Sequence, residues 1–223
     1  MLPSQTVENY LKSIYLAEAA LPVDRDLVPM GQLAAALSVT PGTATTMVKA
    51  LADSGLAHYE PYAGVRLTPA GEKLASMVLR RHRLIELFLV KVLGMSWAEV
   101  HDEAEHLEHA VSDRLIDRID EMLGRPTVDP HGDPIPTAEG HVAQHNSTDL
   151  LSCDVGVPMR VVRVIDQDPQ FLHFVEASAL MPGEQVTVES RDEMADRVSL
   201  RYPSGRTTTV GTRAAAKILV SDT

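Results

Sequence analysis

The spacing of apolar residues changes once along this chain, and that change limits the folds available to it. From residue 6 to residue 123, apolar side chains recur every three to four positions, as in amphipathic helices. From residue 151 onward, short β-branched runs such as VPMRVVRVI, EQVTVES and RVSLRY are separated by turn residues. The sequence therefore predicts a mainly α-helical chain that ends in a small antiparallel β-barrel.

The length and composition set outer limits on the class of protein. A chain of 223 residues with 44% hydrophobic content can bury a sizeable core in one large domain or in two to three small ones. Apolar runs of membrane-spanning length and a signal-peptide pattern are both missing, so we expect a cytoplasmic protein without a membrane partner. The single cysteine, Cys153, excludes a disulfide framework and a cysteine zinc finger, and we expect a buried, inert thiol.

The distribution of charge indicates which part of the chain could approach DNA. The net charge of −11 argues against nonspecific nucleic-acid binding by the whole surface. Residues 1–75 carry 5 basic and 7 acidic side chains and are nearest to neutral, whereas residues 76–123 carry 6 and 10. Any DNA contact is therefore expected in residues 1–75, and a bound cation elsewhere would reduce the repulsion.

Residues 1–75 have the order of elements of a winged helix-turn-helix. Helical patterns cover residues 6–20, 30–37 and 43–55, and the last two are joined by the tight turn SVTPG. Short extended runs then flank Ala63 and Gly64, which predicts a hairpin. Helix, turn, helix and hairpin in this order predict a DNA-binding domain.

The start of the third helix holds the candidate DNA-reading groups. Hydroxyls and exposed backbone amides suit phosphates and thymine methyl groups, whereas bidentate guanine readout would need an arginine that this segment lacks. Ordinary helix capping is the alternative role for such threonines. The candidates in the turn and at the helix start are Thr40, Gly42, Thr43, Thr45 and Thr46. The candidates for contacts with the DNA backbone are Lys49 in the helix and Arg66 and Tyr62 in the hairpin.

Two further helical patterns and a linker are expected between the hairpin and the barrel. The first covers residues 69–94 and allows a break near His82. The second is expected as one helix from Ser96 to Gly124, because Ser96 followed by Glu99 has the spacing of a capping box. Residues 125–149 are rich in proline, glycine and polar residues, which predicts a linker.

The second pattern begins with three histidines and four carboxylates in residues 101–109. On a helix, His101, Glu105, Glu108 and His109 share one face, and His82 and Glu86 are four apart on the preceding helix. Imidazole and carboxylate donors without thiolate favour manganese or iron over structural zinc. A solvated acidic surface remains the alternative. A zinc peptidase is disfavoured, because the segment 105–109 has Glu105 where the inverted zincin motif H-x-x-E-H requires its first histidine.

The run LRRHRLIELFLVKVLGMSWAEVHDEAEHLEHAVSDRLIDRI, followed by DPHGDPIP, resembles the diphtheria toxin repressor family of metal-dependent transcriptional regulators. The resemblance extends over essentially the whole chain. It implies a winged helix-turn-helix in residues 1–75, a helical metal-binding and dimerisation domain with its linker in residues 76–148, and an SH3-like, FeoA-like barrel in residues 149–223. It also implies a homodimer that binds a double-stranded DNA operator and has no enzymatic activity.

The resemblance also implies two metal sites. The primary site would use Asn9 with Glu105, Glu108 and His109. The ancillary site would use the ligands His82, Glu86 and His101, completed from the barrel by Asp168 and Gln170.

Two departures from the iron-responsive pattern of this family bear on the metal. Iron-responsive members carry cysteine at the position of Glu105 and methionine at that of Asn9, and these softer sulfur ligands favour iron(II). The sequence therefore predicts a manganese(II)-dependent repressor of metal-homeostasis genes, with iron(II) or cobalt(II) as alternative ions. An iron-dependent repressor and a metalloenzyme are the alternative functions, and a repressor that senses a small molecule would not need the clustered ligands.

Overall fold

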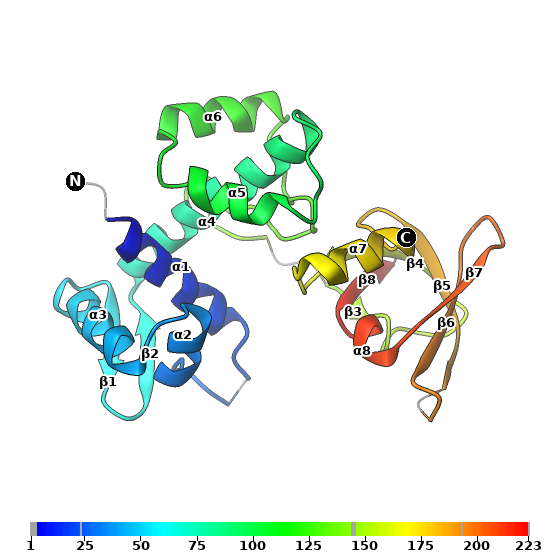
Figure 1. The fold of residues 1–223 in the computed structure, drawn as a ribbon, viewed down its shortest axis with the longest axis horizontal. Helices are drawn as coiled ribbons and strands as arrows, with labels where there is room; N and C mark the ends of the chain where they lie inside the picture. The colour runs from blue at the N-terminus through cyan, green and yellow to red at the C-terminus, as the bar shows by residue number, and fades with distance from the viewer. Residues whose placement is uncertain (1–3, 23, 144–145, 193, 223) are drawn as a thin grey trace. The chain divides into compact units, whose positions relative to one another are not determined.

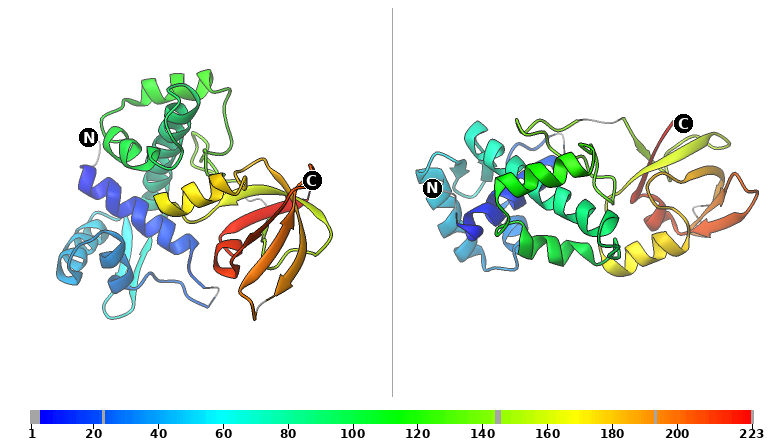
Figure 2. Two further views of the ribbon diagram at one scale, coloured as in Figure 1. Left: turned by 45° about the vertical axis from the view of Figure 1, so that its right-hand side comes forward. Right: turned by 90° about the horizontal axis from the view of Figure 1, so that it is seen from above.

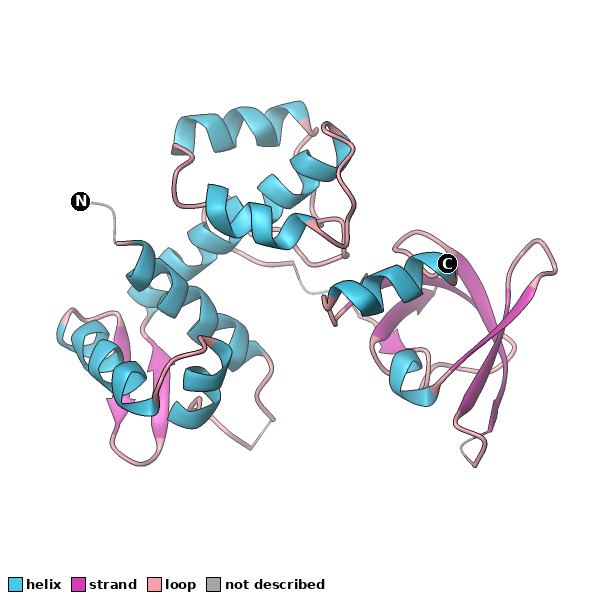
Figure 3. Cartoon of the chain, viewed as in Figure 1, coloured by secondary structure: helices cyan, strands magenta, loops and turns pink. Residues whose placement is uncertain are grey.

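The computed structural model describes residues 4–22, 24–143, 146–192 and 194–222. The chain forms two compact units, residues 1–82 with 136–142 and residues 83–135 with 143–223. Helices make up most of the first half of the chain, and the larger sheet lies in the C-terminal part (Figures 1 and 3). No helix among the described residues is long and apolar enough to span a membrane.

The first unit contains the helix-turn-helix and its hairpin. The helices are α1 (Gln5–Ala19), α2 (Met30–Ala36) and α3 (Pro41–Asp53), and β1 (Ala57–Glu60) pairs antiparallel with β2 (Gly64–Leu67). Their apolar faces share one core, whose fully buried members include Leu11, Ile14, Leu33, Val48 and Val65. The predicted winged helix-turn-helix is confirmed.

Helix α4 (Pro69–Lys91) is unbroken, and the division between the two units falls between His82 and Arg83. In the second unit, α4 is followed by α5 (Val100–Leu107) and α6 (Asp113–Met122). Leu84, Val100, Ala104 and Ile116 pack together between these helices. The allowed break near His82 is therefore not used.

The single helix expected from Ser96 to Gly124 is wrong. Glu99 N donates to Ser96 O in a turn, α5 begins only at Val100, and it has no side-chain cap. The helix then ends at Leu107, and Ser112 adopts an extended backbone and accepts a hydrogen bond from Leu115 N to start α6. A serine that caps a new helix competes with continuation of the old one, which apolar spacing alone does not reveal.

The C-terminal part is a six-stranded antiparallel sheet in the order β3-β8-β4-β5-β6-β7. Its strands are β3 (Thr148–Asp149), β4 (Pro158–Val164), β5 (Gln185–Asp192), β6 (Arg197–Arg201), β7 (Thr207–Val210) and β8 (Ile218–Asp222). Helix α7 (Pro169–Ala177), which the sequence did not predict, lies beside this sheet in both views of Figure 2, and α8 (Thr212–Ala215) precedes β8. Inward side chains such as Val161, Val188 and Leu200 form the core, and the expected fold class is confirmed.

Part of the expected linker is instead a buried loop. Asp129, His131 and Asp133 are 4%, 0% and 4% exposed. Gly132 has φ +86°, and a Cβ there would lie 1.9 Å from Val162 O, so only glycine allows this approach to β4. The expectation of a linker is wrong for this loop, because proline and glycine here build a tight, packed turn.

Candidate metal centre and DNA-reading helix

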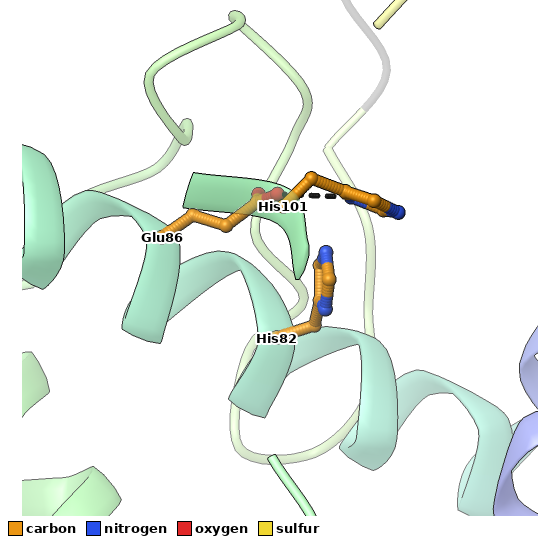
Figure 4. Close-up of side chains that lie close together, drawn as sticks. All are labelled: His82, Glu86 and His101. Carbon is orange, nitrogen blue, oxygen red and sulfur yellow. Dashed lines mark hydrogen bonds and ion pairs between the residues drawn. The ribbon is translucent and has the colours of Figure 1, made fainter. Parts of the chain in front are cut away.

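Helix α4 presents His82 and Glu86 one turn apart, and α5 brings His101 to them (Figure 4). One ligand atom from each of these three residues lies within 4.8 Å of the others. The Nδ1 atom of His101 is 3.3 Å from Oε1 of Glu86, whose side chain is 1% exposed. These are the three helical residues that the sequence assigned to the ancillary site, and the structure brings them together.

Helix α5 and the turn after it carry the three acidic and imidazole groups assigned to the primary site. The Oε1 atom of the buried Glu108 is 3.2 Å from Nε2 of His109. Glu105 Oε1 lies 3.8 Å from Nε2 of His101, so His101 contacts acids of both predicted sites. His82, Glu105 and Glu108 also form a grouping with ligand atoms within 4.8 Å.

Asn9, the fourth predicted primary ligand, lies on α1 in the first unit. Within the described part of the chain, its buried Oδ1 atom has no hydrogen-bond partner, which leaves this oxygen available to a metal ion. The preceding residue, Glu8, pairs with Arg81 of α4 at 2.8 Å. Because Glu105, Glu108 and His109 belong to the second unit, the joint ligand set with Asn9 stays a prediction.

A third grouping consists of Glu86, Asp129 and His131, and the sequence reasoning missed it. His131 Nε2 lies 2.8 Å from Trp97 O, and because a carbonyl only accepts, Nε2 carries the proton. In a neutral ring, this leaves the lone pair on Nδ1, which is 4.0 Å from Glu86 Oε2 and 3.9 Å from Asp129 Oδ1. A backbone carbonyl that fixes the tautomer in this way is typical of a metal-binding histidine.

The loop geometry explains how Asp129 is held. Its Oδ1 accepts hydrogen bonds from the backbone N–H groups of His131 at 2.8 Å and Asp133 at 2.9 Å. These bonds turn the chain and aim the carboxylate inward. The available signal in the sequence was the pairing of aspartates and a histidine within DPHGDP, which the proline- and glycine-rich composition outweighed.

Buried negative charge is concentrated around this loop. Burial raises the pKa of Asp129 well above its ordinary value, and repulsion from Asp133 and Glu86 adds to the effect, while Arg83 opposes it. Arg83 lies 3.7 Å from Asp129 and 3.6 Å from Asp133, so one guanidinium is shared between two carboxylates. Arg163, which is partly exposed, also pairs with Asp133.

This donor set fits a divalent first-row cation. It offers imidazole nitrogens and carboxylate oxygens, and buried carboxylates in excess of cations favour a positive ion. Cys153, by contrast, is buried in the barrel core, its Sγ lies 3.8 Å from Leu150 O, and burial raises the pKa of the thiol. The three groupings therefore contain nitrogen and oxygen donors only.

The barrel residues proposed for the ancillary site have a structural role in α7. Asp168 is the N-cap of this helix, and its Oδ1 accepts hydrogen bonds from Gln170 N at 3.0 Å and Phe171 N at 3.1 Å. Both Asp168 and Gln170 are exposed. None of the three groupings includes Asp168, so metal binding by these two residues stays a prediction.

The DNA-reading candidates gather at the start of α3. Thr40 caps the helix by accepting from Thr43 N at 3.2 Å, and a Cβ at Gly42 would lie 3.9 Å from Thr40 Oγ1, which is ordinary van der Waals contact. Thr45 and Thr46 donate their hydroxyl protons to Pro41 O and Gly42 O at 2.8 and 3.0 Å. Both capping and DNA reading remain compatible with these contacts, since the hydroxyl oxygens can still accept.

The cationic candidates lie nearby in the same unit. Lys49 is on the exposed part of α3, and its Nζ lies 6.0 Å from the centroid of the Tyr59 ring in β1. Arg66 is exposed on β2, directly across from His58. Helix α3 and the hairpin thus each carry an exposed cation, and DNA contact by these residues stays a prediction.

A winged helix-turn-helix joined to helices lined with histidine and carboxylate defines a class of metal-dependent DNA-binding regulator. Family comparison agrees. Residues 3–65 match "Iron dependent repressor, N-terminal DNA binding domain", residues 68–137 match "Iron dependent repressor, metal binding and dimerisation domain", and residues 148–222 match "FeoA domain". The chain belongs to the diphtheria toxin repressor family of metal-dependent transcriptional regulators.

Individual relatives support this assignment over most of the chain. The "HTH-type transcriptional regulator MntR" of Lysinibacillus sphaericus is 33% identical over 145 residues, which cover 65% of this chain and 99% of that protein. The "Iron-dependent repressor IdeR" of Mycobacterium tuberculosis is 30% identical, with 83% of this chain and 84% of that protein covered.

A solved structure described as "Manganese-dependent transcriptional repressor complex with manganese" is 40% identical and has a TM-score of 0.87. The match covers 97% of this chain and 100% of that one. These similarities place the chain in the manganese branch of the family, as the sequence predicted. The chain is a metal-dependent DNA-binding repressor, and the metalloenzyme alternative is not supported, because the matched family consists of repressors.

Proposed function

We propose that this chain is a manganese(II)-dependent repressor that binds a double-stranded operator as a homodimer in the cytoplasm and controls metal-homeostasis genes. The observation that carries the proposal is the Glu86 carboxylate, which has a histidine ring nitrogen near each oxygen: His101 at 3.3 Å and His131 at 4.0 Å. A buried carboxylate between two imidazoles is a ligand set rather than a solvated surface.

The choice of manganese rests on the donors of this chain. Glu105 occupies the position where iron-responsive members carry cysteine, and the three groupings contain no sulfur. Two solved structures that resemble the chain at 40% and 38% identity are described as manganese-dependent repressors. Iron(II) and cobalt(II) are the alternative ions, since nitrogen and oxygen donors also bind them.

A bound divalent cation would supply positive charge to the buried carboxylates. Glu86 contacts α5 through His101 and the 129–133 loop through His131, so its charge bears on three segments of the second unit. Helix α4 continues from Glu86 into the first unit, where Arg81 pairs with Glu8 of α1. We infer that a cation which stabilises these contacts shifts the conformational ensemble of the chain towards the form that binds DNA.

The ligand assignments and domain limits extend the proposal. We propose metal binding by Asn9, Glu105, Glu108 and His109 and by His82, Glu86 and His101, to which the structure adds Asp129 and His131. The division into residues 1–75, 76–148 and 149–223 belongs to the same proposal. In a homodimer, two α3 helices would enter successive major grooves of the operator.

The test is operator binding measured by fluorescence anisotropy. The probe is a labelled duplex that the manganese-loaded chain selects from a random-sequence pool, and binding is compared with Mn(II), Fe(II), Zn(II) and chelator. Coupling of about 1–3 kcal/mol predicts that manganese raises affinity about 5–150-fold over chelator. Equal affinity in all four conditions would contradict metal dependence and favour a repressor that senses a small molecule.

The metal ranking is tested by exchanging the two positions that distinguish the branches. Glu105→Cys combined with Asn9→Met introduces sulfur donors and is expected to shift the response towards iron(II). The matched control is Glu103→Cys, an exposed position two residues from Glu105 that lies outside the groupings. If the double variant keeps the wild-type ranking of metals, selectivity does not reside at these positions.

A further inference from the structure

The segment 134–142, which the composition assigns to a linker, is held along one face of helix α4. Four residues of that helix contact it, and their offsets of 3, 7 and 10 from the first place them within roughly an 80° arc. They are Lys73, Ser76, Arg80 and Arg83. We call the segment 134–142 the strap, because a helix face that grips one stretch of chain fixes its path.

The three cations of this face hold the strap by its backbone carbonyls. The pairs are Arg83 with Pro134 O, Arg80 with Pro136 O at 3.0 Å, and Lys73 with Ala138 O at 3.4 Å and with Glu139 O. Later positions of the strap meet earlier positions of α4, so the two segments run in opposite directions. Charge-assisted hydrogen bonds at three points along its length hold the strap in place.

At its far end, the strap approaches α4 closely enough to require glycine. Gly140 has φ +90°, and a Cβ there would lie 2.5 Å from Oγ of Ser76. Ser76 is 2% exposed, and its hydroxyl donates to Lys73 O at 2.8 Å, so its side chain is held in place. Residues 136–142 of the strap and this part of α4 both belong to the first unit, which contains the DNA-binding elements.

At its near end, the strap continues directly from the 129–133 loop. Asp129 N donates to Asp133 O at 2.9 Å, which closes the loop at its base. Arg83 pairs with both aspartates and donates to Pro134 O, so one guanidinium holds the loop and the first residue of the strap. When a bound cation meets the charge of Asp129, Arg83 is left to Asp133 and Pro134, because like charges repel.

The strap is stiff where it leaves the loop. Pro134 and Pro136 fix their own φ and restrict the residue before each of them, so this stretch has few rotations that could absorb a displacement. Ile135, between the prolines, donates its N–H to Thr127 O at 2.8 Å. A shift of the loop is therefore passed on to residues 136–142.

We propose that the strap carries the metal-bound state of the 129–133 loop to the first unit, in parallel with α4. The chain passes from the second unit into the first between residues 135 and 136, within the strap. This inference rests on the proposed function and deepens it, because it names a second route by which a bound cation favours the form that binds DNA.

The test compares Gly140→Ala with Gly156→Ala by anisotropy with the selected duplex, in chelator and in saturating manganese. Both variants place alanine at positive φ, since Gly156 has φ +83°, but among the described residues nothing lies within 4 Å of a Cβ at Gly156. Only Gly140→Ala therefore displaces the strap. Its manganese-induced gain in operator affinity is expected to fall about 2–30-fold, whereas Gly156→Ala should keep the wild-type gain.

Binding of manganese in the absence of DNA is followed by the fluorescence of Trp97. Trp97 is the single tryptophan of the chain, and its ring stacks on His131 with 5.4 Å between the centroids. The midpoint of this titration should be the same for Gly140→Ala and wild type, because the neighbours of Gly140 are not proposed ligands. A midpoint that rises in proportion to the lost gain would place the defect in the metal site and overturn the inference.

A second variant keeps the inference testable if Gly140→Ala does not fold. Lys73→Met removes one grip on the strap and retains a good helix former, and Lys91→Met at the other end of α4 is its control. Lys73→Met should have the smaller manganese-induced gain. A gain equal to that of the control in every folded variant would overturn the inference and leave metal dependence intact, whereas a wild-type chain without any gain would overturn the proposed function as well.

Discussion

Replacing Asp129 by asparagine should stabilise the metal-free protein, which is unusual for a buried, hydrogen-bonded residue. Asparagine keeps an Oδ1 that can accept from His131 N and Asp133 N, at 2.8 and 2.9 Å in the wild type. It removes a carboxylate whose pKa is raised by burial and by repulsion from Asp133 and Glu86. The substitution removes the ion pair between Asp129 and Arg83, which are 3.7 Å apart, but Arg83 still pairs with Asp133 at 3.6 Å.

The expected gain follows from these opposing contacts. Because the carboxylate is desolvated and is repelled by two neighbouring acids, we expect Asp129→Asn to gain about 1–2 kcal/mol without metal at pH 7. For a chain of this size, that gain raises the melting temperature by about 2–8 °C. With manganese at 100 times its dissociation constant, a wild-type site contributes about 2.7 kcal/mol, and the variant should lose this increment.

The assay is thermal unfolding by circular dichroism with chelator and with manganese. Asp154→Asn is the matched control, because Asp154 is an exposed acid outside the groupings. It should leave both melting temperatures within about 1 °C of wild type. A lower melting temperature for metal-free Asp129→Asn, with an intact manganese response, would show that Asp129 is a structural residue and refute this reasoning.

Three further predictions concern the DNA-binding unit. Burial raises the pKa of Glu18 above its ordinary 4.5, although the hydrogen bond from Leu67 N lowers it. The contribution of Glu18 to stability is therefore full below pH 4.5 and is lost as the pH rises through the pKa of the folded state. Glu18→Gln should flatten this decline in melting temperature between pH 4.5 and 7. Lys49→Ala should weaken binding to all duplexes and reduce the slope of log affinity against log salt by about one, as measured by anisotropy titrations. Arg81→Met should cost about 3 kcal/mol in urea unfolding, because the buried Glu8 loses this cation, and adding Glu8→Gln should restore most of the loss.

The order of elements and the helical ligands could be predicted because they depend on local spacing. Apolar residues three to four apart identify α1, α3 and α4, and turn residues locate the hairpin. His82 and Glu86 must share a helix face at a separation of four. That His101 reaches Glu86 depends on how α5 packs against α4, and the family resemblance supplied it.

The remaining features depend on contacts between residues far apart in the sequence. The 129–133 loop has the composition of a linker, and its burial results from the approach of Gly132 to β4 and the bond from His131 to Trp97 O. The break before α6 results from capping by Ser112. The positive φ of Tyr62 is likewise a property of the folded hairpin, since proline followed by tyrosine does not by itself favour a type II turn.

The most direct test of the central claim is anomalous diffraction at the manganese absorption edge from crystals of the chain grown with Mn(II). The account predicts anomalous peaks within bonding distance of the Glu86 carboxylate, with a histidine nitrogen of His101 or His131 as a further ligand. Peaks confined to exposed acidic residues, with none at Glu86, would contradict the assignment of these buried groups as the metal centre.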